Sequence, residues 1–270
     1  MNVILLAHTQ LSERFVDLTF NYDGIERKTL EPKFKGGLKH NFTDGQAVAL
    51  TAIRTCYSAN KPSEIVVKEG AKYFGKPATD GKGGSDADRL FRHIVNSGHT
   101  STLEHLTFTF AIEGVSRALL AQLTRHRVGF SFSVQSQRYV RFGSDDKTGG
   151  FDYVVSPSIT DDKKAPSNDN EDYYVEMSAL EYFENFMREA QYVYDRLRKA
   201  GVAPEDARMV LPNAAATNLV MTANLRALLD FYSKRRKGRG AQWEIADLAE
   251  KLREAVVAVE PWTDAFFEQA

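Results

Sequence analysis

The residues best suited to chemistry lie in one segment near the middle of this chain. Three consecutive side chains that are or can become cationic stand at Arg125, His126 and Arg127. After eight intervening residues come four more polar side chains: Ser136, Gln137, Arg138 and Tyr139. Arginine grips phosphate through two parallel hydrogen bonds, and serine and glutamine supply further donors. The segment therefore predicts a binding site for a polar, anionic ligand.

The stretch between these positions predicts a loop wrapped around that ligand. Residues 128–138 read VGFSFSVQSQR, and so many hydroxyl and amide groups would be costly in a core. The chain contains neither a GxGxxG nor a GxxxxGK[ST] pattern, which argues against a Rossmann or P-loop nucleotide site. A nucleotide bound here would be held by side chains, without a glycine-rich phosphate loop.

Three other kinds of site have weaker support. Ser136 and His126 could form a hydrolase pair, but no GxSxG surrounds the serine and no acid is placed to orient the histidine. His99, His105 and His126 match no zinc-binding spacing, so no metal is predicted. The basic run at residues 234–239 could contact nucleic acid, but aromatic stacking partners are sparse, so nucleic acid is disfavoured.

Composition bounds the class of protein. Of the 270 residues 43% are hydrophobic, which is enough for a packed core. The 35 Lys and Arg against 36 Asp and Glu give no bulk attraction to nucleic acid or membranes. A single cysteine, Cys56, excludes an internal disulfide. With no signal peptide and no apolar run of membrane length, the expectation is a cytoplasmic protein.

The elements that must position the segment are both strands and helices. Period-two alternation predicts a strand at residues 105–113, and shorter strands are expected at 3–7 and 215–221. A helix over 116–127 would place the RHR triplet at its C-terminal end, where the macrodipole favours cations. Further helices are expected from Asp44, from Asp86 or Asp88, over 173–199, from Pro204, and over 224–235 and 242–259. This predicts one α+β domain, with a central antiparallel or mixed sheet and flanking helices.

The RHR triplet with its following serine resembles the motif of the flavin-dependent thymidylate synthases. The flanks agree with that family in order and spacing: GHTSTLEH at 98–105, RMVLP at 208–212, TANLR at 222–226, AQWE at 241–244 and PW at 261–262. The resemblance covers about 45–58 and 86–265 of a single domain over 1–270. Residues of about 9–43 and 60–85 are interpreted as insertions.

The resemblance implies a methyltransferase that converts dUMP to dTMP, with FAD as cofactor and NADPH and 5,10-methylenetetrahydrofolate as co-substrates. It implies FAD contacts from Ser101, Arg125, His126, Arg127, Asn224 and Arg226, with His99 on the flavin or folate side. It implies dUMP contacts from Gln122, Arg125, Ser136, Gln137, Arg138, Arg208 and Arg235. It also implies a homotetramer whose active sites lie between subunits.

Three positions need separate treatment. Counting forward from Asn224 selects Arg235 as the arginine that activates the uracil ring, whereas counting back from AQWE selects Arg236. We take Arg235, because a loop absorbs an inserted residue more easily than a helix does. Val134 replaces the usual Glu or Gln, and Asp230 the usual Asn or His, at two expected FAD contacts. These departures leave an alternative open: a catalytically weakened nucleotide- or nucleic-acid-binding protein on the same scaffold.

Overall fold

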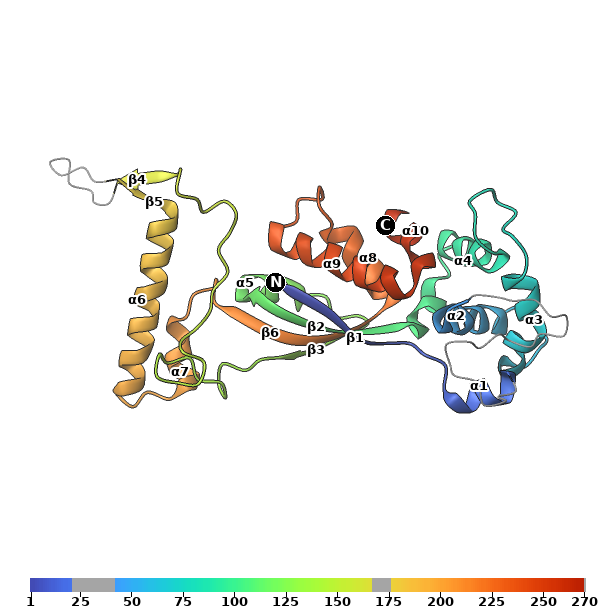
Figure 1. Cartoon of the computed structure of the whole chain (residues 1–270), viewed down its shortest axis with the longest axis horizontal. Helices are drawn as coiled ribbons and strands as arrows, with labels where there is room; N and C mark the ends of the chain where they lie inside the picture. Colours follow the sequence, from blue (N-terminus) through green and yellow to red (C-terminus); the bar gives the residue numbers. More distant parts are fainter. Residues whose placement is uncertain (21–41, 167–175, 270) are drawn as a thin grey trace. The chain divides into compact units, whose positions relative to one another are not determined.

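The computed structural model of the protein describes residues 1–20, 42–166 and 176–269 (Figure 1). Most of the predicted insertion at 9–43 and the start of the predicted helix at 173–199 therefore lie outside the described residues. The strands are β1 (Asn2–His8), β2 (Thr107–Ser116), β3 (Phe130–Val134), β4 (Lys164–Pro166), β5 (Glu176–Ser178) and β6 (Ala216–Asn224). They form a four-stranded sheet of order β1-β2-β6-β3 and a two-stranded antiparallel pair of β4 with β5.

The helices account for most of the remaining described residues. They are α1 (Glu13–Phe20), α2 (Asp44–Thr55), α3 (Ile65–Phe74), α4 (Asp86–Asn96), α5 (Arg117–Leu123), α6 (Ala179–Lys199), α7 (Pro204–Ala207), α8 (Leu225–Arg235), α9 (Trp243–Val259) and α10 (Asp264–Gln269). Short 3-10 helices are η2 (Pro62–Glu64), η3 (Thr100–His105), η4 (Arg208–Val210) and η5 (Pro261–Thr263). Helices combined with a separate sheet confirm the α+β class. Within the described ranges, every helix is too short or too polar to cross a membrane.

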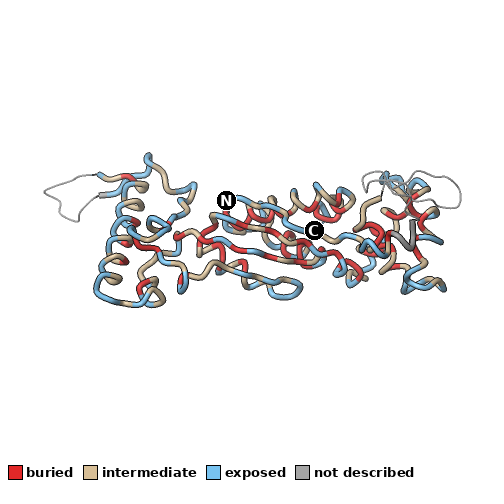
Figure 2. The backbone as a smooth tube through the Cα atoms, turned by 60° about the horizontal axis from the view of Figure 1, so that its bottom comes forward, coloured by how far each residue is buried: buried red, intermediate tan, exposed pale blue. Residues whose placement is uncertain are grey.

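The three predicted strands are present as β1, β2 and β6, although β2 begins at Thr107 and not at residue 105, whereas β3, β4 and β5 were not predicted. In β2, the buried Phe108, Phe110 and Ile112 alternate with less buried residues, as period two requires. Figure 2 colours the backbone by burial and shows buried and exposed residues interspersed along it. The predicted loop at 128–138 is wrong over Phe130–Val134, because this segment is a strand. Its half-buried Phe130, Phe132 and Val134 alternate with exposed serines, which is the same period-two signal in a more polar sequence.

Side-chain caps set where the helices begin. Thr43, rather than the predicted Asp44, caps α2, and Ser85 caps α4, each with a reciprocal capping box. The predicted helix over 116–127 is wrong at its end, since α5 stops at Leu123 and the RHR triplet lies in the turn beyond it. The helix predicted from residue 173 begins at Ala179, because β5 occupies Glu176–Ser178.

The described residues gather into two compact units. Unit 1 comprises residues 1–2, 112–125 and 132–220, and unit 2 comprises residues 3–111, 126–131 and 221–270. The prediction of a single domain over the whole chain stays a prediction.

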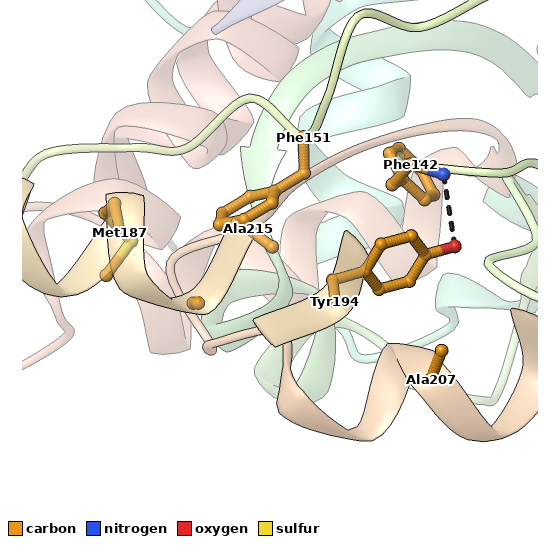
Figure 3. Close-up of a cluster of buried hydrophobic side chains, with 7 residues drawn as sticks. Phe142, Phe151, Met187, Tyr194, Ala207 and Ala215 are labelled. Carbon is orange, nitrogen blue, oxygen red and sulfur yellow. Dashed lines mark hydrogen bonds between the residues drawn. The ribbon is translucent and has the colours of Figure 1, made fainter. Parts of the chain in front are cut away.

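The core of unit 1 forms along the inner face of α6. Met187, Ala190 and Tyr194 of this helix pack with other buried side chains: Phe142, Phe151, Ala207 and Ala215 (Figure 3). The Tyr194 hydroxyl accepts the backbone N–H of Phe142 at 3.2 Å, which satisfies a buried donor. Ala207 belongs to α7, so this core fixes the position of that short helix and of the 3-10 helix η4 that follows it.

Unit 2 is built from helices that pack in two groups, α2 with α3 and α4, and α8 with α9 (Figure 1). Glu260, only 1% exposed, joins the C-terminal end of α9 to the start of α2. Its carboxylate accepts hydrogen bonds from Thr43 Oγ1, Trp262 Nε1 and the backbone N–H of Gly45. Burial raises the pKa of Glu260, and these hydrogen bonds offset only part of that rise.

Candidate active site

The RHR motif lies in a tight turn whose shape depends on Gly129. This residue has a φ of +77°, and a Cβ built on it would lie only 2.7 Å from both Ala227 Cβ and Asn224 Nδ2. The backbone N–H of Asn224 donates to the carbonyl of Gly129 at 3.1 Å. The turn is therefore held directly against the beginning of α8, and only glycine fits that approach.

His126 and Arg235, 109 positions apart in sequence, are in direct contact. Arg235 Nε donates to His126 Nε2 at 3.1 Å. A ring nitrogen that accepts a hydrogen bond carries no proton, so the bond assigns His126 as neutral with its proton on Nδ1. Its ring stacks edge-on against Phe231 at 4.9 Å between centroids and lies 6.1 Å from Phe130. The motif histidine is thus fixed from two sides.

The other cations near this turn are more open to solvent. Arg125 and Arg127, on either side of His126, are both exposed. Arg236 follows α8 as its C-terminal cap and donates its backbone N–H to Tyr232. The structure thus brings Arg235, the preferred candidate for uracil activation, into contact with the motif.

The first turn of α8 contains two further predicted site residues. Asn224 is the N-cap, and its Oδ1 accepts the backbone N–H of Ala227 at 2.8 Å. Arg226 forms an ion pair with Glu104 of η3, in which both side chains are about half exposed. The Asn224 side chain thus caps α8, and Arg226 is paired with Glu104.

One face of α8 borders a groove of about 450 Å³ within unit 2. Arg226, Leu229, Asp230 and Ser233 follow the three- and four-residue spacing of a single helical stripe. The opposite wall comes from the end of α4, from η3 and from α10: Val95, Asn96, Thr100, Leu103, Phe266 and Gln269. Asp230 forms an ion pair with Lys234 at 2.7 Å. The groove combines one cation, one acid, hydroxyl and amide groups and apolar side chains, a mixed lining that can contact both rings and polar groups of a ligand.

His99 has an aromatic neighbour that the sequence did not suggest. Tyr57 Oη lies 3.1 Å from His99 Nδ1, and the two rings meet edge to face at 6.1 Å. The chain on either side of Tyr57 is anchored by Glu69, which accepts hydrogen bonds from Arg54 and Asn60. Tyr57 is nevertheless 59% exposed, so its ring is available to a ligand. Ser101, two residues beyond His99, is also exposed.

In unit 1, three of the residues predicted to bind dUMP, Ser136, Gln137 and Arg138, lie at a turn after β3. Ser136 Oγ accepts the backbone N–H of Arg138 at 3.2 Å, and Gln137 is buried. Gln122 donates to the backbone carbonyl of Ala118 at 3.3 Å, within its own helix α5. Val134 is half-buried at the end of β3. No base among the described residues bonds to the Ser136 hydroxyl, so the hydrolase pair has no support.

Arginines gather around Glu205 in unit 1. Arg138 forms an ion pair with the Glu205 carboxylate through its Nε, and Arg208 Nε donates to the Glu205 backbone carbonyl at 2.9 Å. Burial lowers the pKa of the Arg117 guanidinium, and the charge of Arg208 lowers it further. Two guanidinium groups contact Glu205, and Arg117 adds positive charge near Arg208, which favours an anionic ligand.

Comparison with known proteins shows which family the chain belongs to. A family model described as thymidylate synthase complementing protein matches residues 38–262. The flavin-dependent thymidylate synthase of Geobacter sulfurreducens is 39% identical over 224 residues, which cover 83% of this chain and 82% of that protein. The chain belongs to the flavin-dependent thymidylate synthase family. The enzyme of that name from Clostridium tetani is 34% identical over 80% of this chain and 79% of its own length.

Solved structures agree with that family. The UMP/dUMP methylase PolB from Streptomyces cacaoi, bound with 5-Br dUMP, superposes with a TM-score of 0.59 at 26% identity, covering 83% of this chain and 90% of PolB. Thymidylate synthase X from Helicobacter pylori, with FAD and dUMP, gives a TM-score of 0.55 at 22% identity over 100% and 98% of the two chains. The latter likeness shows the fold.

Three residues that contact or lie near the predicted site residues were not selected from the sequence: Arg117, Glu205 and Tyr57. Arg117 and Glu205 each stand in the first turn of a helix, where a charged residue has an ordinary structural explanation. Tyr57 lies near the end of a stretch that resembles the family, and no spacing rule connects it to His99. Only the fold brings these side chains beside the motif residues.

Proposed function

We propose that the protein is a flavin-dependent thymidylate synthase, a methyltransferase that converts dUMP to dTMP. The observation that carries the proposal is the contact of Arg235 with His126 of the RHR motif, in a chain that belongs to this family. This contact joins the RHR motif to the end of α8, two segments that lie 109 positions apart and that each resemble the family.

The proposed cofactor is FAD, because the relatives are flavin-dependent enzymes and the resemblance of the RHR motif implies FAD contacts. The residues present fit it: the RHR turn offers exposed arginines, and the α8 groove adds Arg226 beside apolar side chains. FAD would be held by six residues: His99, Ser101, Arg125, His126, Arg127 and Asn224, the last through its side-chain Nδ2 because Oδ1 caps α8. Asp230 places an acid in the same groove, but its pairing with Lys234 balances that charge. When bound, FAD reduced by NADPH supplies the hydride, and 5,10-methylenetetrahydrofolate supplies the carbon.

The substrate dUMP fits the arginine cluster of unit 1. Arg138 and Arg208, with Arg125, would bind the phosphate, and Gln122, Ser136 and Gln137 would supply hydrogen bonds. The Streptomyces cacaoi methylase was solved with 5-Br dUMP, which supports a uridine nucleotide as ligand of the shared fold. Because the Ser136 hydroxyl has no base beside it among the described residues, its role is to bind rather than to attack.

Arg235 has the catalytic role in this proposal. Its Nε donates to His126, which restricts the orientation of the side chain, and the terminal guanidinium nitrogens would contact the uracil ring. A fixed cation beside the uracil ring stabilises negative charge that develops on the ring during methylation. His126 therefore both lines the flavin site and orients Arg235.

The assembly proposed is a homotetramer in the cytoplasm, with each active site completed by neighbouring subunits. In an oligomer with closed symmetry, the same residues of each subunit occur at every active site. The single cysteine fits a reducing compartment. Size-exclusion chromatography with light scattering gives the mass directly, and a monomer at micromolar concentration would overturn this part of the proposal.

Visible spectroscopy tests the ligand assignments. Purified protein with FAD is expected to show oxidised-flavin absorption that shifts when dUMP is added, because hydride transfer in the proposed reaction requires the nucleotide to lie beside the flavin. Deoxyuridine, which lacks the phosphate, is the control and should shift the bands only at much higher concentration. Absence of bound flavin at any FAD concentration would refute the proposed function.

A further inference from the structure

Glu205 is a carboxylate placed among cations that the proposed function assigns to phosphate binding. It is the only acid among the described residues that forms an ion pair with Arg138. The same residue also accepts, through its backbone carbonyl, the Nε–H of Arg208 at 2.9 Å. One residue therefore contacts both guanidinium groups, each through the Nε atom.

The position of Glu205 is fixed by the core of unit 1. It lies in the first turn of α7, which begins at Pro204 and places Ala207 in the buried cluster around Tyr194 (Figure 3). The backbone of Arg138 is fixed as well, because its N–H donates to Ser136 Oγ and Val140 packs against the same cluster. The ion pair thus joins two rigid backbones, so it can hold a side chain in one orientation.

Both arginines are held through Nε, Arg138 by the Glu205 carboxylate and Arg208 by the Glu205 backbone carbonyl. The Arg138 guanidinium also lies over the Tyr139 ring, 5.5 Å from the ring centroid. A guanidinium binds a phosphate best through two parallel N–H groups, and its Nη1/Nη2 end offers such a pair. Holding each arginine by Nε restricts the orientations that its terminal nitrogens can take toward an anion.

We infer that Glu205 is a positioning residue that orients Arg138 and Arg208 toward the phosphate of the nucleotide. This inference rests on the proposed function, because it takes dUMP as the ligand of these arginines. Glu205 itself does not touch the nucleotide and would repel a dianion placed against it. Its favourable effect must therefore pass through Arg138.

The test measures nucleotide affinity by calorimetry on the FAD-loaded protein. Glu205→Gln should weaken dUMP binding about fivefold, the upper range for a half-exposed ion pair, and leave deoxyuridine binding unchanged. Glu205→Asp should recover part of the loss. Glu184→Gln is the matched control, since it removes the acid of another exposed ion pair, with Arg188 on α6, and should change nothing.

A double-mutant cycle separates positioning from general stability. In an Arg138→Ala background, Glu205→Gln should no longer weaken dUMP binding and should strengthen it slightly, because only the repulsion remains to be removed. Three results would overturn the inference: tighter dUMP binding by Glu205→Gln alone, unchanged binding, or the same loss with and without Arg138. Wild-type protein that binds dUMP without forming dTMP would overturn the proposed function but leave this comparison intact. Wild-type protein that binds no dUMP would overturn both.

Discussion

Replacing Gly129 by alanine should disrupt the RHR turn more than its single methyl group suggests. A left-handed backbone costs a non-glycine residue about 1–2 kcal/mol. The new Cβ would also lie 2.7 Å from Ala227 Cβ, well inside ordinary van der Waals contact. Overpacking of this kind costs about 1–3 kcal/mol, so the free energy of unfolding should fall by about 2–5 kcal/mol.

Gly81→Ala is the matched control for backbone strain. Gly81 has a similar φ of +72°, but no atom lies within 4 Å of the position its Cβ would take. This variant should lose only the strain, about 1–2 kcal/mol. Urea denaturation monitored by fluorescence measures both changes, and the difference between the two variants isolates the close approach to α8.

The same substitution should weaken FAD binding. To relieve the clash, the turn must move away from α8, and His126 then moves away from Arg235. FAD affinity, measured from flavin absorbance during titration, should fall about tenfold or more in Gly129→Ala, since a turn displaced by a fraction of an ångström loses well-aligned contacts. The reasoning would be refuted if the two glycine variants were destabilised equally and FAD affinity were unchanged. The close packing of the RHR turn against α8 would then not be needed for FAD binding.

Three further predictions follow from the site and its supports. Arg235→Ala should lower kcat about a hundredfold with FAD still bound, as loss of one electrostatic catalytic group does, while Arg236→Ala should keep most of the activity. Ser136→Ala should raise KM for dUMP about tenfold with measurable kcat, because the serine binds and does not attack. The stability that Glu260 provides over a Glu260→Gln variant should be full below its ordinary pKa of 4.5 and shrink as the pH rises through the raised pKa of the folded protein.

Each of these has an outcome that contradicts it. Loss of activity in Arg236→Ala rather than in Arg235→Ala would show that the uracil-activating arginine is the one after α8. Inactive Ser136→Ala that binds dUMP normally would restore the nucleophile hypothesis. Thermal unfolding of wild type and Glu260→Gln between pH 4.5 and 7 tests the third, and a stability difference that grows with pH would mean that burial does not raise the pKa of Glu260.

Much of the fold could be predicted because local patterns and packing agree. The alternation of Phe108, Phe110 and Ile112 placed β2, and Asn224 marked the start of α8. Pro204 marked the start of α7 for the same kind of reason, since proline suits the first helical turn. These signals are local, so they can be recognised in the sequence without knowing what the helices and strands pack against.

The errors arose where two local signals competed. Serines made the stretch around β3 look like a loop, although its period-two pattern marked a strand with one exposed face. Ala and Leu after Ser116 suggested a helix reaching the RHR triplet, but α5 ends at Leu123, before it. The macrodipole explanation for those cations therefore does not apply. The RHR triplet lies instead in a turn shaped by Gly129, where its side chains can bind a ligand.

The site was predictable as a set of residues and not as a set of contacts. Motif order selected His126 and Arg235, but their hydrogen bond depends on how α8 packs against the turn at Gly129. Glu205 could not be selected at all, because its importance lies in the two arginines that fold around it. Long-range pairing of this kind has no local sequence pattern.

The most direct test of the central claim is formation of dTMP. The protein is incubated without oxygen with dUMP, FAD, NADPH and 5,10-methylenetetrahydrofolate, and the nucleotides are separated by chromatography. The account predicts that dTMP accumulates over many turnovers and that omitting dUMP, the folate or the reductant abolishes it. Protein that binds FAD and dUMP but forms no dTMP under these conditions would contradict the account and identify a nucleotide-binding protein without this activity.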